Sequence, residues 1–139
     1  MNQFVLIVRI SIDLLIIFSV VKDLKKYAKS HKGQDYVQLE MKFLPDYPFL
    51  PPFIRVVTPR FAFHTGRVTV GGSICFELLT SSGWNSVNSL EAIFFQIKYE
   101  MTYGSPRIDF SNNYPYSETE ARDAFFRVAS QKGWKTKGL

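Results

Sequence analysis

The sequence predicts an α+β domain, with helices packed on one face of an antiparallel sheet. Segments with the two-residue alternation of half-buried strands come first, and segments with helical spacing and capping residues follow them. The 139 residues suit a single domain that buries its own core, because 46% of them are hydrophobic and 13 are Phe.

The first 22 residues are strongly apolar, and we interpret them as a divergent or truncated N-terminal segment before a core domain at 23–137. Arg9 and Asp13 interrupt the apolar run, and each charge would cost about 2.5–3.5 kcal/mol inside a membrane. We therefore expect no membrane span, with a membrane-anchored form as the alternative. Alternation around Arg9 predicts a strand that continues through 14–21 as a buried strand or a helix.

The next elements follow from local spacing. The lysine-rich segment Asp23–Ser30 predicts one or two exposed helical turns. Apolar and polar residues alternate completely over Tyr36–Phe43, which predicts a half-buried antiparallel strand. A second strand is expected at Phe53–Thr58, because four prolines in the intervening segment remove backbone donors. Residues 60–79 have little periodicity and several glycines, which is typical of an extended loop.

Two helices are predicted in the last third of the chain. Asn88–Glu91 supplies an N-cap with a glutamate three residues later, and apolar residues at helical spacing follow it as far as Met101. Ser117–Glu120 is a second capping box, and Gly133 is the expected helix end. The segment 104–116 between the helices favours a loop, with a short edge strand as the alternative.

Cys75 is the only cysteine, so it cannot form an internal disulfide and needs an explanation in packing or in chemistry. An inert buried thiol is one possibility. A single cysteine without a recognisable secretion signal also favours a reducing environment, so we expect a cytoplasmic or nuclear location.

Three motifs around Cys75 occur in a recognisable order. Tyr-Pro-x-x-Pro-Pro at Tyr47–Pro52 is followed by Gly-x-Ile-Cys at Gly72–Cys75 and then by Gly83-Trp84 ahead of a helix. This order resembles the core of ubiquitin-conjugating enzymes, and the likeness runs from Asp23 to Trp134. Pro51–Val57 and the residues flanking Cys75 are most similar to the Q-type branch of that family.

The resemblance implies the UBC-like fold, with Cys75 on a loop as the nucleophile that carries ubiquitin or a ubiquitin-like modifier as a thioester. The activating enzyme would supply the modifier, and a substrate lysine would receive it, usually with the help of a ubiquitin ligase. The carrier would need no metal or organic cofactor. In the family, the proline-rich loop lies near the surface that ligases contact, which makes Pro48, Phe49 and Leu50 candidate partner-binding residues.

Several residues are candidates for supporting roles in catalysis. The family's His-Pro-Asn triplet is replaced here by His64-Thr65-Gly66-Arg67, so the usual asparagine that stabilises the oxyanion is missing. Candidate replacements are His64, Asn85, Ser86 or backbone amides of the glycine turn, and His64 can equally be a loop residue with local contacts only. Glu118 could orient the acceptor lysine or simply cap its helix. Trp84 is expected to pack beside the cysteine loop.

Other functions remain as alternatives. The family's first helix has no clear counterpart before Tyr36, which together with the missing asparagine favours a catalytically inactive scaffold that docks ubiquitin or a ligase. The net charge of +5 comes from basic flanks, which are either solvated faces or a surface for an acidic protein. A nucleic-acid-binding domain would rest on this charge alone, so no specific nucleic acid is expected. A cysteine hydrolase is disfavoured, because no histidine follows Cys75.

Overall fold

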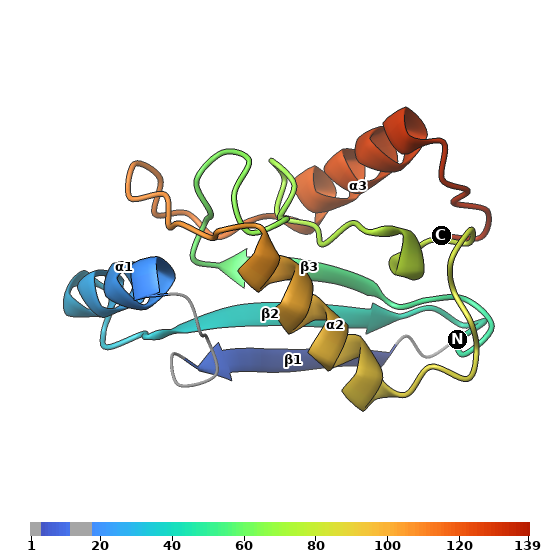
Figure 1. The fold of residues 1–139 in the computed structure, drawn as a ribbon, viewed down its shortest axis with the longest axis horizontal. Coiled ribbons are helices and arrows are strands. Elements are labelled where there is room, and N and C mark those ends of the chain that lie inside the picture. Colours follow the sequence, from blue (N-terminus) through green and yellow to red (C-terminus); the bar gives the residue numbers. More distant parts are fainter. Residues whose placement is uncertain (1–3, 12–17) are drawn as a thin grey trace.

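The computed structural model describes residues 4–11 and 18–139, and it confirms the α+β class (Figure 1). The elements in chain order are β1 (Phe4–Ser11), α1 (Phe18–Ser30), β2 (Tyr36–Phe43), β3 (Phe53–Thr58), a short 3-10 helix (Glu77–Leu79), α2 (Leu90–Tyr103) and α3 (Glu118–Lys132). The bounds of β2 and β3 are those that alternation and the flanking prolines predict.

The three strands form one antiparallel sheet in the order β1-β2-β3. β1 pairs with β2 along its whole length, from Phe4 opposite Phe43 to Ser11 opposite Tyr36. This pairing confirms the strand predicted around Arg9. Of the continuation expected at 14–21 as a strand or a helix, residues 14–17 lie outside the described residues, and 18–21 form the first turn of α1, the helical alternative. β2 pairs with β3 through a register shift beside Leu39.

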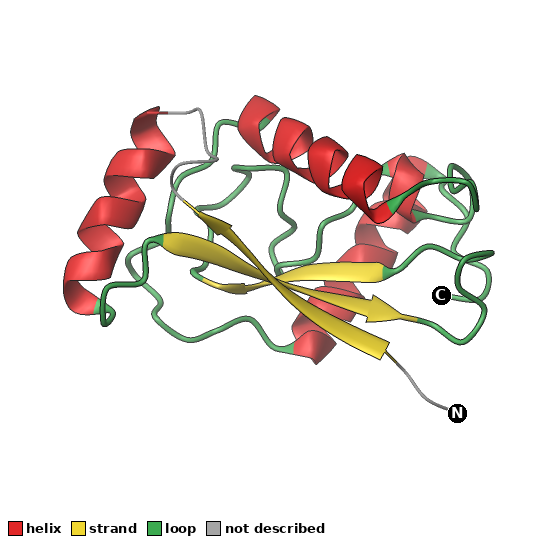
Figure 2. Cartoon of the chain, turned by 90° about the horizontal axis from the view of Figure 1, so that it is seen from below, coloured by secondary structure: helices red, strands yellow, loops and turns green. Residues whose placement is uncertain are grey.

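The main core lies between one face of the sheet and two helices. α2 crosses this face, and α1 lies across one end of the sheet (Figures 1 and 2). Alternate residues of β2 point inward because side chains of a strand alternate between its faces. Helical spacing brings apolar residues of α2 onto the same core. The fully buried members from these two elements are Val37, Leu39, Met41, Ile93, Ile97 and Met101.

α1 is longer and more deeply buried than the sequence suggested. Leu24 and Tyr27 belong to the main core, so the expectation of exposed turns at Asp23–Ser30 is wrong for one side of this helix. Asp23 is also buried, and its carboxylate accepts hydrogen bonds from Arg107 Nε at 2.7 Å and from the backbone N–H of Ile108 at 3.0 Å. A distant loop residue thus satisfies a charge that the sequence alone would place in water.

The caps of the last two helices explain where they begin and end. Ser117 and Glu120 form the predicted capping box of α3, and Gly133 ends the helix in the left-handed conformation at φ 71°. The N-cap of α2 is Ser89, one residue after the predicted Asn88, and the Ser89 side chain accepts a hydrogen bond from Ala92 N–H. α3 lies beyond β3, and it buries Phe125 against Phe53 in a second, smaller apolar cluster (Figure 1).

The connection between α2 and α3 is a loop, as its composition favours. Ile108 makes a single antiparallel bridge with Phe61, and no longer strand forms at this place. Within the described residues, no helix has the length and apolar character that a membrane span requires.

Candidate active site around Cys75

Cys75 follows a tight hairpin that lies beside β3. Gly72 N–H donates to Thr69 O at 2.9 Å to close the turn, and the Thr69 and Ser73 hydroxyl groups are 2.7 Å apart. Ile74 N–H donates to Ile54 O at 2.9 Å, which fixes the returning arm of the hairpin on the sheet. Backbone hydrogen bonds therefore fix the chain as far as Ile74, the residue before Cys75.

Two glycines allow the N-terminal end of α3 to approach this hairpin. Gly72 has φ 95°, and a Cβ atom there would lie 2.4 Å from the ring of Tyr116. A Cβ atom on Gly71 would lie 2.0 Å from the carbonyl oxygen of Glu120. The Gly-Gly pair of the cysteine motif is thus explained by close packing against the start of α3.

The thiol of Cys75 lies on the edge of the smaller apolar cluster. Cys75 is half-buried, and it packs against the cluster formed by Phe53, Ala121 and Phe125. Its Sγ–H group donates a long, weak hydrogen bond to the carbonyl oxygen of Phe125, with 3.9 Å between the heavy atoms. Residues of α3 and β3 therefore pack against Cys75, and the residue as a whole is only partly buried.

Burial raises the pKa of the Cys75 thiol to about 11. Desolvation disfavours the thiolate, because a charge is poorly stabilised among aromatic and aliphatic groups. At pH 7, only about one thiol in ten thousand would be ionised at such a pKa. The Cys75 thiol is therefore protonated at neutral pH in the folded chain.

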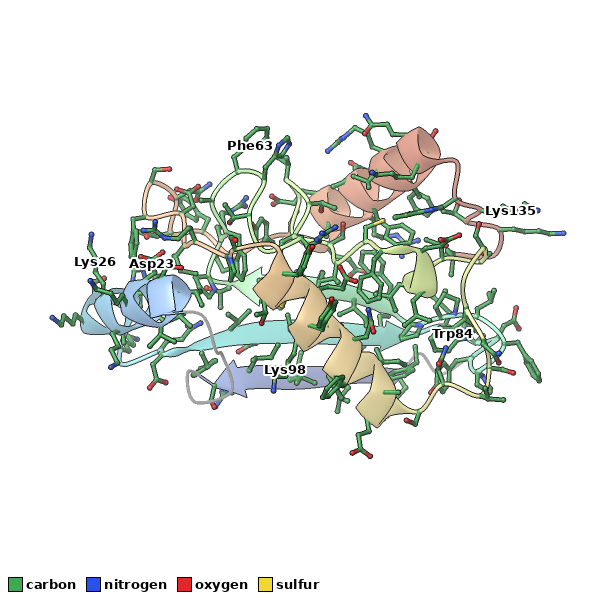
Figure 3. The ribbon with its side chains drawn as sticks, viewed as in Figure 1. Asp23, Lys26, Phe63, Trp84, Lys98 and Lys135 are labelled. Carbon is green, nitrogen blue, oxygen red and sulfur yellow. The ribbon has the colours of Figure 1, made fainter. Side chains whose placement is uncertain are left out.

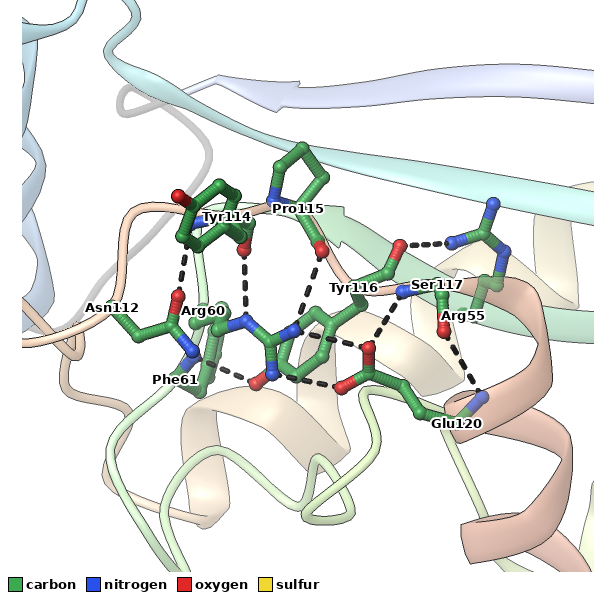
Figure 4. Close-up of polar contacts among 9 residues, drawn as sticks. All are labelled: Arg55, Arg60, Phe61, Asn112, Tyr114, Pro115, Tyr116, Ser117 and Glu120. Carbon is green, nitrogen blue, oxygen red and sulfur yellow. Dashed lines mark hydrogen bonds and ion pairs between the residues drawn. The ribbon is translucent and has the colours of Figure 1, made fainter.

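A polar network anchors the start of α3 beside the cysteine hairpin (Figure 4). Arg60 donates to the backbone oxygen of Tyr114 at 2.8 Å, and its guanidinium group pairs with Glu120 at 2.8 and 3.0 Å. Arg55 donates to the backbone oxygen of Tyr116 at 2.9 Å. The Tyr116 hydroxyl in turn accepts a hydrogen bond from a backbone N–H group at Phe61. Residues of β3 and of the loop after it thus hold residues 114–116 in place, and Tyr116 of this segment packs on the hairpin.

The structure does not bring the candidate oxyanion donors into hydrogen-bond contact with Cys75. His64 is exposed at φ 58°, and its ring stacks on Phe63 with 3.8 Å between the centroids. Asn85 is also exposed, and its side-chain oxygen accepts a hydrogen bond from Val87 N–H at 3.1 Å within a local turn. Ser86 is exposed as well. Backbone amides near the cysteine remain candidates for the oxyanion role.

Glu118 is the first residue of α3, where a negative charge is favourable, and its carboxylate pairs with Lys42 of β2. The hydrogen bond from Lys42 lowers the pKa of Glu118, outweighing the opposing effect of partial burial. Both observations provide a structural role for this side chain.

The proline-rich loop is linked to Trp84 rather than to the cysteine directly. Trp84 Nε1–H donates to the backbone oxygen of Pro48 at 2.7 Å, and its ring lies 6.3 Å from that of Tyr47 (Figure 3 labels Trp84). Phe49 is 78% exposed, whereas Leu50 is partly buried. The loop thus presents a free aromatic side chain, as a contact residue for a partner requires.

The C-terminal residue is a part of the site that sequence patterns did not indicate. Leu139 packs against the same small cluster as Cys75 and Phe126. It also lines a small apolar cavity with Phe53, Phe125 and residues of the preceding loops. An isolated leucine after a lysine-rich stretch gives no periodic signal, so only the folded chain reveals this contact.

The family profile described as ubiquitin-conjugating enzyme matches residues 28–107, which is more than half of the chain. Together with the α+β fold and the loop-borne cysteine, this match shows that the chain belongs to the ubiquitin-conjugating enzyme family. Its Q-type character, indicated by the residues around Cys75, is confirmed by its relatives.

The chain is 38% identical over 112 residues to ubiquitin-conjugating enzyme E2 Q1 of Homo sapiens, covering 78% of the chain and 26% of that protein. It is 37% identical over 120 residues to ubiquitin-conjugating enzyme E2 25 of Caenorhabditis elegans, covering 83% and 30% respectively. It is 34% identical over 108 residues to a shorter Q-like ubiquitin-conjugating enzyme protein of Homo sapiens, covering 73% and 66%. The chain therefore spans about a quarter of the length of E2 Q1.

Proposed function

We propose that this protein accepts ubiquitin or a ubiquitin-like modifier as a thioester on Cys75 and passes it to a lysine of a protein substrate. The activating enzyme supplies the modifier, and a ligase brings the substrate. The observation that carries the proposal is the position of Cys75. The chain's single cysteine is half-buried on a loop within the segment that matches the family profile.

The proposed chemistry consists of two acyl transfers. In the first, Sγ of Cys75 attacks the thioester carbonyl on the activating enzyme, and the departing thiolate takes up the proton that Cys75 loses. In the second, a neutral lysine amine attacks the new thioester, a C–N amide bond forms and the C–S bond breaks, and the proton that the amine loses ends on the Cys75 sulfur as the thiol. Each step passes through an oxyanion that nearby N–H groups can stabilise.

The raised pKa of Cys75 favours retention of the modifier between the two steps. A thiol with a pKa of about 11 is a poorer leaving group than an ordinary thiol, which slows spontaneous discharge of the thioester to water. The same property makes the first step depend on the activating enzyme for orientation and proton transfer. The carrier would thus hold its modifier until an acceptor is positioned.

The test is a charging reaction with activating enzyme, ATP and ubiquitin, analysed on nonreducing and reducing gels. We expect a band one ubiquitin heavier that disappears with reductant and is absent from Cys75→Ala. Cys75→Ser should instead give a band that resists reductant, because a hydroxyl nucleophile forms an ester. Absence of the band from the folded wild-type chain with ubiquitin and with ubiquitin-like modifiers would refute the proposal.

A catalytically inactive scaffold is the second candidate. It is favoured by the side chains of His64 and Asn85, neither of which hydrogen-bonds to Cys75. A scaffold would bind ubiquitin or a ligase equally well in the wild-type chain and in Cys75→Ala. It would leave no reductant-sensitive band in the charging reaction. Exposed Phe49 would serve ligase docking under either function.

A further inference from the structure

The helix α1 is inserted between two neighbouring strands. β1 and β2 pair along their whole length, and their pairing ends with Ser11 opposite Tyr36. Antiparallel neighbours need only a two-residue turn, whereas residues 12–35 connect these two strands, and α1 takes up 18–30 of them. Most of α1 also precedes residues 28–107, which match the family profile. Pairing of the strands therefore does not explain why the chain carries this helix.

α1 has a buried face and a charged face. Val20, Leu24 and Tyr27 are buried in the main core, and they hold the helix across one end of the sheet (Figure 1). Four lysines recur at positions i, i+3, i+4 and i+7, so they share the opposite side of the helix. All four are exposed, and Figure 3 labels Lys26 among them. We call these four residues the lysine face: Lys22, Lys25, Lys26 and Lys29.

The charge of α1 is strongly one-sided. Asp23 is the only acidic residue of this helix, and its buried carboxylate accepts hydrogen bonds from the Arg107 guanidinium group and from Ile108 N–H. Lysines three or four positions apart repel each other, which weakens a helix. A mixture of acidic and basic side chains would be solvated equally well without that repulsion. Attraction to an anionic partner therefore explains the repeated lysines, whereas stability of the helix does not.

The length and chemistry of the lysine face favour an acidic protein segment as this partner. Lys22 and Lys29 are separated by about 10 Å along the helix axis, which about three or four residues of extended chain would span. α1 contains no arginine, the residue whose planar group binds two phosphate oxygens at once. Among the described side chains of α1, no large apolar residue is exposed for insertion into a lipid surface. A run of carboxylates thus fits this face better than nucleic acid or an anionic membrane.

We propose that the lysine face of α1 is a docking surface for an acidic protein segment, a short run of Asp and Glu residues. The carboxylates pair with the exposed amines, and the buried side of the helix keeps its backbone in place. α1 lies at the end of the sheet away from the C-terminus, and Leu139 at that terminus packs on the same small cluster as Cys75 (Figure 1). The bound segment therefore leaves Cys75 uncovered, and the inference does not depend on the proposed thioester function.

The experiment measures binding of a fluorescein-labelled peptide of about eight glutamates, long enough to cross the lysine face when extended. Fluorescence anisotropy is recorded with the full chain at about 0.15 M salt, where exposed charges act over only about 8 Å. We expect saturable binding of this peptide and no binding of a matched glutamine peptide. Nuclear magnetic resonance of the wild-type chain should show that the amide signals displaced by the peptide belong to α1.

Matched variants separate the lysine face from the overall charge of the chain. Lys25→Gln/Lys29→Gln should weaken binding of the glutamate peptide about tenfold, because two amines of the face lose their charge. Lys135→Gln/Lys137→Gln removes the same charge from exposed residues near the C-terminus, and it should change the affinity less than about twofold. Circular dichroism melting curves show whether each variant keeps the fold of the wild type.

Three results would overturn the inference. The first is an absence of peptide binding at this salt concentration. The second is an equal loss of affinity in the two variants, or displaced amide signals spread over the molecule, since either shows attraction by net charge alone. The third is tighter binding, also lost in Lys25→Gln/Lys29→Gln, of a single-stranded oligothymidylate or of phosphatidylcholine vesicles with about 30% phosphatidylserine. That result would assign the face to nucleic acid or to a lipid surface instead.

Discussion

Groups of β3 and α3 determine the environment of the Cys75 thiol. Cys75 packs against a cluster that includes Phe53 of β3 and Phe125 of α3, and the carbonyl oxygen of Phe125 accepts a weak hydrogen bond from its thiol. A carbonyl oxygen favours the protonated thiol over the thiolate. The residue is thus protected from reagents that require a thiolate, although it is not fully buried.

Alkylation of the folded chain should reveal this protection. Because the pKa of Cys75 is raised to about 11, its reaction with iodoacetamide should be slow at pH 7.5 and should accelerate about tenfold per pH unit up to pH 10. Mass spectrometry of the intact protein measures the rate, since only one cysteine can react. The urea-unfolded chain is the control, and its rate should level off near about pH 8.5–9. A plateau at that pH in the folded chain would contradict the prediction.

Asp23 is a second residue whose charge is set by the fold. Burial would raise the pKa of this carboxyl, but hydrogen bonds from Arg107 and Ile108 N–H outweigh that effect, so the pKa is lowered. A lowered pKa in the folded state contributes stability above the ordinary value of 3.8, and this stability is lost as the pH falls through the folded pKa. The pair therefore tethers α1 to the loop after α2 most strongly near neutral pH.

Asp23→Asn should lower the free energy of unfolding by about 1–3 kcal/mol at pH 7, since it removes a charged acceptor from a buried N–H group. Urea denaturation followed by circular dichroism measures the difference. At pH 3, below the ordinary pKa of 3.8, the gap between the two proteins should be smaller, because the stability that the lowered pKa of Asp23 contributes is lost as the pH falls toward the folded pKa. Asp35→Asn, at an exposed position, serves as control and should change stability little. An equal loss for both variants would contradict the structural role of Asp23.

At the scale of elements, the contact between α3 and the cysteine hairpin determines the shape of the site. Gly71 and Gly72 meet Glu120 and Tyr116 without space for a side chain. Arg60 holds the backbone just before α3 from the opposite side. The helix and the hairpin therefore form one unit, although more than forty residues separate them in the chain.

Gly72→Ala should disrupt the contact between α3 and the cysteine hairpin. A methyl group would collide with the Tyr116 ring, and the backbone at φ 95° is unfavourable for alanine. We expect a loss of about 2–4 kcal/mol in unfolding free energy, from strain together with overpacking. Gly33→Ala is the matched control, since φ there is 79° and no atom lies within 4 Å of the added Cβ. It should cost only about 1 kcal/mol, the strain of a left-handed residue. Equal denaturation midpoints for the two variants would contradict the packing argument.

Elements governed by local chemistry could be predicted from the sequence. β2 follows from strict alternation, and α3 follows from a capping box and a terminal glycine, so their bounds match the structure. α1 was only partly predicted, because its burial depends on Arg107 and on contacts with the distant sheet. The motif identifies Cys75, but the packing of Cys75 and Leu139 against the cluster of Phe53, Ala121 and Phe125 arises from long-range contacts that local patterns do not encode.

At the scale of the whole molecule, β1 is an edge strand with an apolar surface. Val5 and Ile7 are 43% and 50% exposed on the face away from the core, and in the described part of the chain the sheet ends at β1. An apolar edge strand offers free backbone groups to a second chain, which favours self-association. The charge of +5 opposes association only in part, because few charges lie on this strand.

Ile7→Lys should therefore reduce self-association at high protein concentration. The new charge lies on the exposed face of the edge strand, where it opposes pairing between chains and costs little stability. Light scattering across a concentration series measures the effect. Lys25→Arg, which preserves charge on exposed α1, is the control and should behave as the wild type. Unchanged scattering for Ile7→Lys would show that the edge of β1 does not mediate association.

The close contact between Leu50 and Gly138 near the end of the chain has a mechanical consequence. Gly138 packs so closely against Leu50 that a Cβ atom there would lie 2.7 Å from it, and the next residue touches the cluster around Cys75. A protein that binds the neighbouring Phe49 would shift Leu50, and through Gly138 and Leu139 it would disturb the apolar cluster against which Cys75 also packs. Binding of a partner at Phe49 would then change how closely the cluster packs against Cys75.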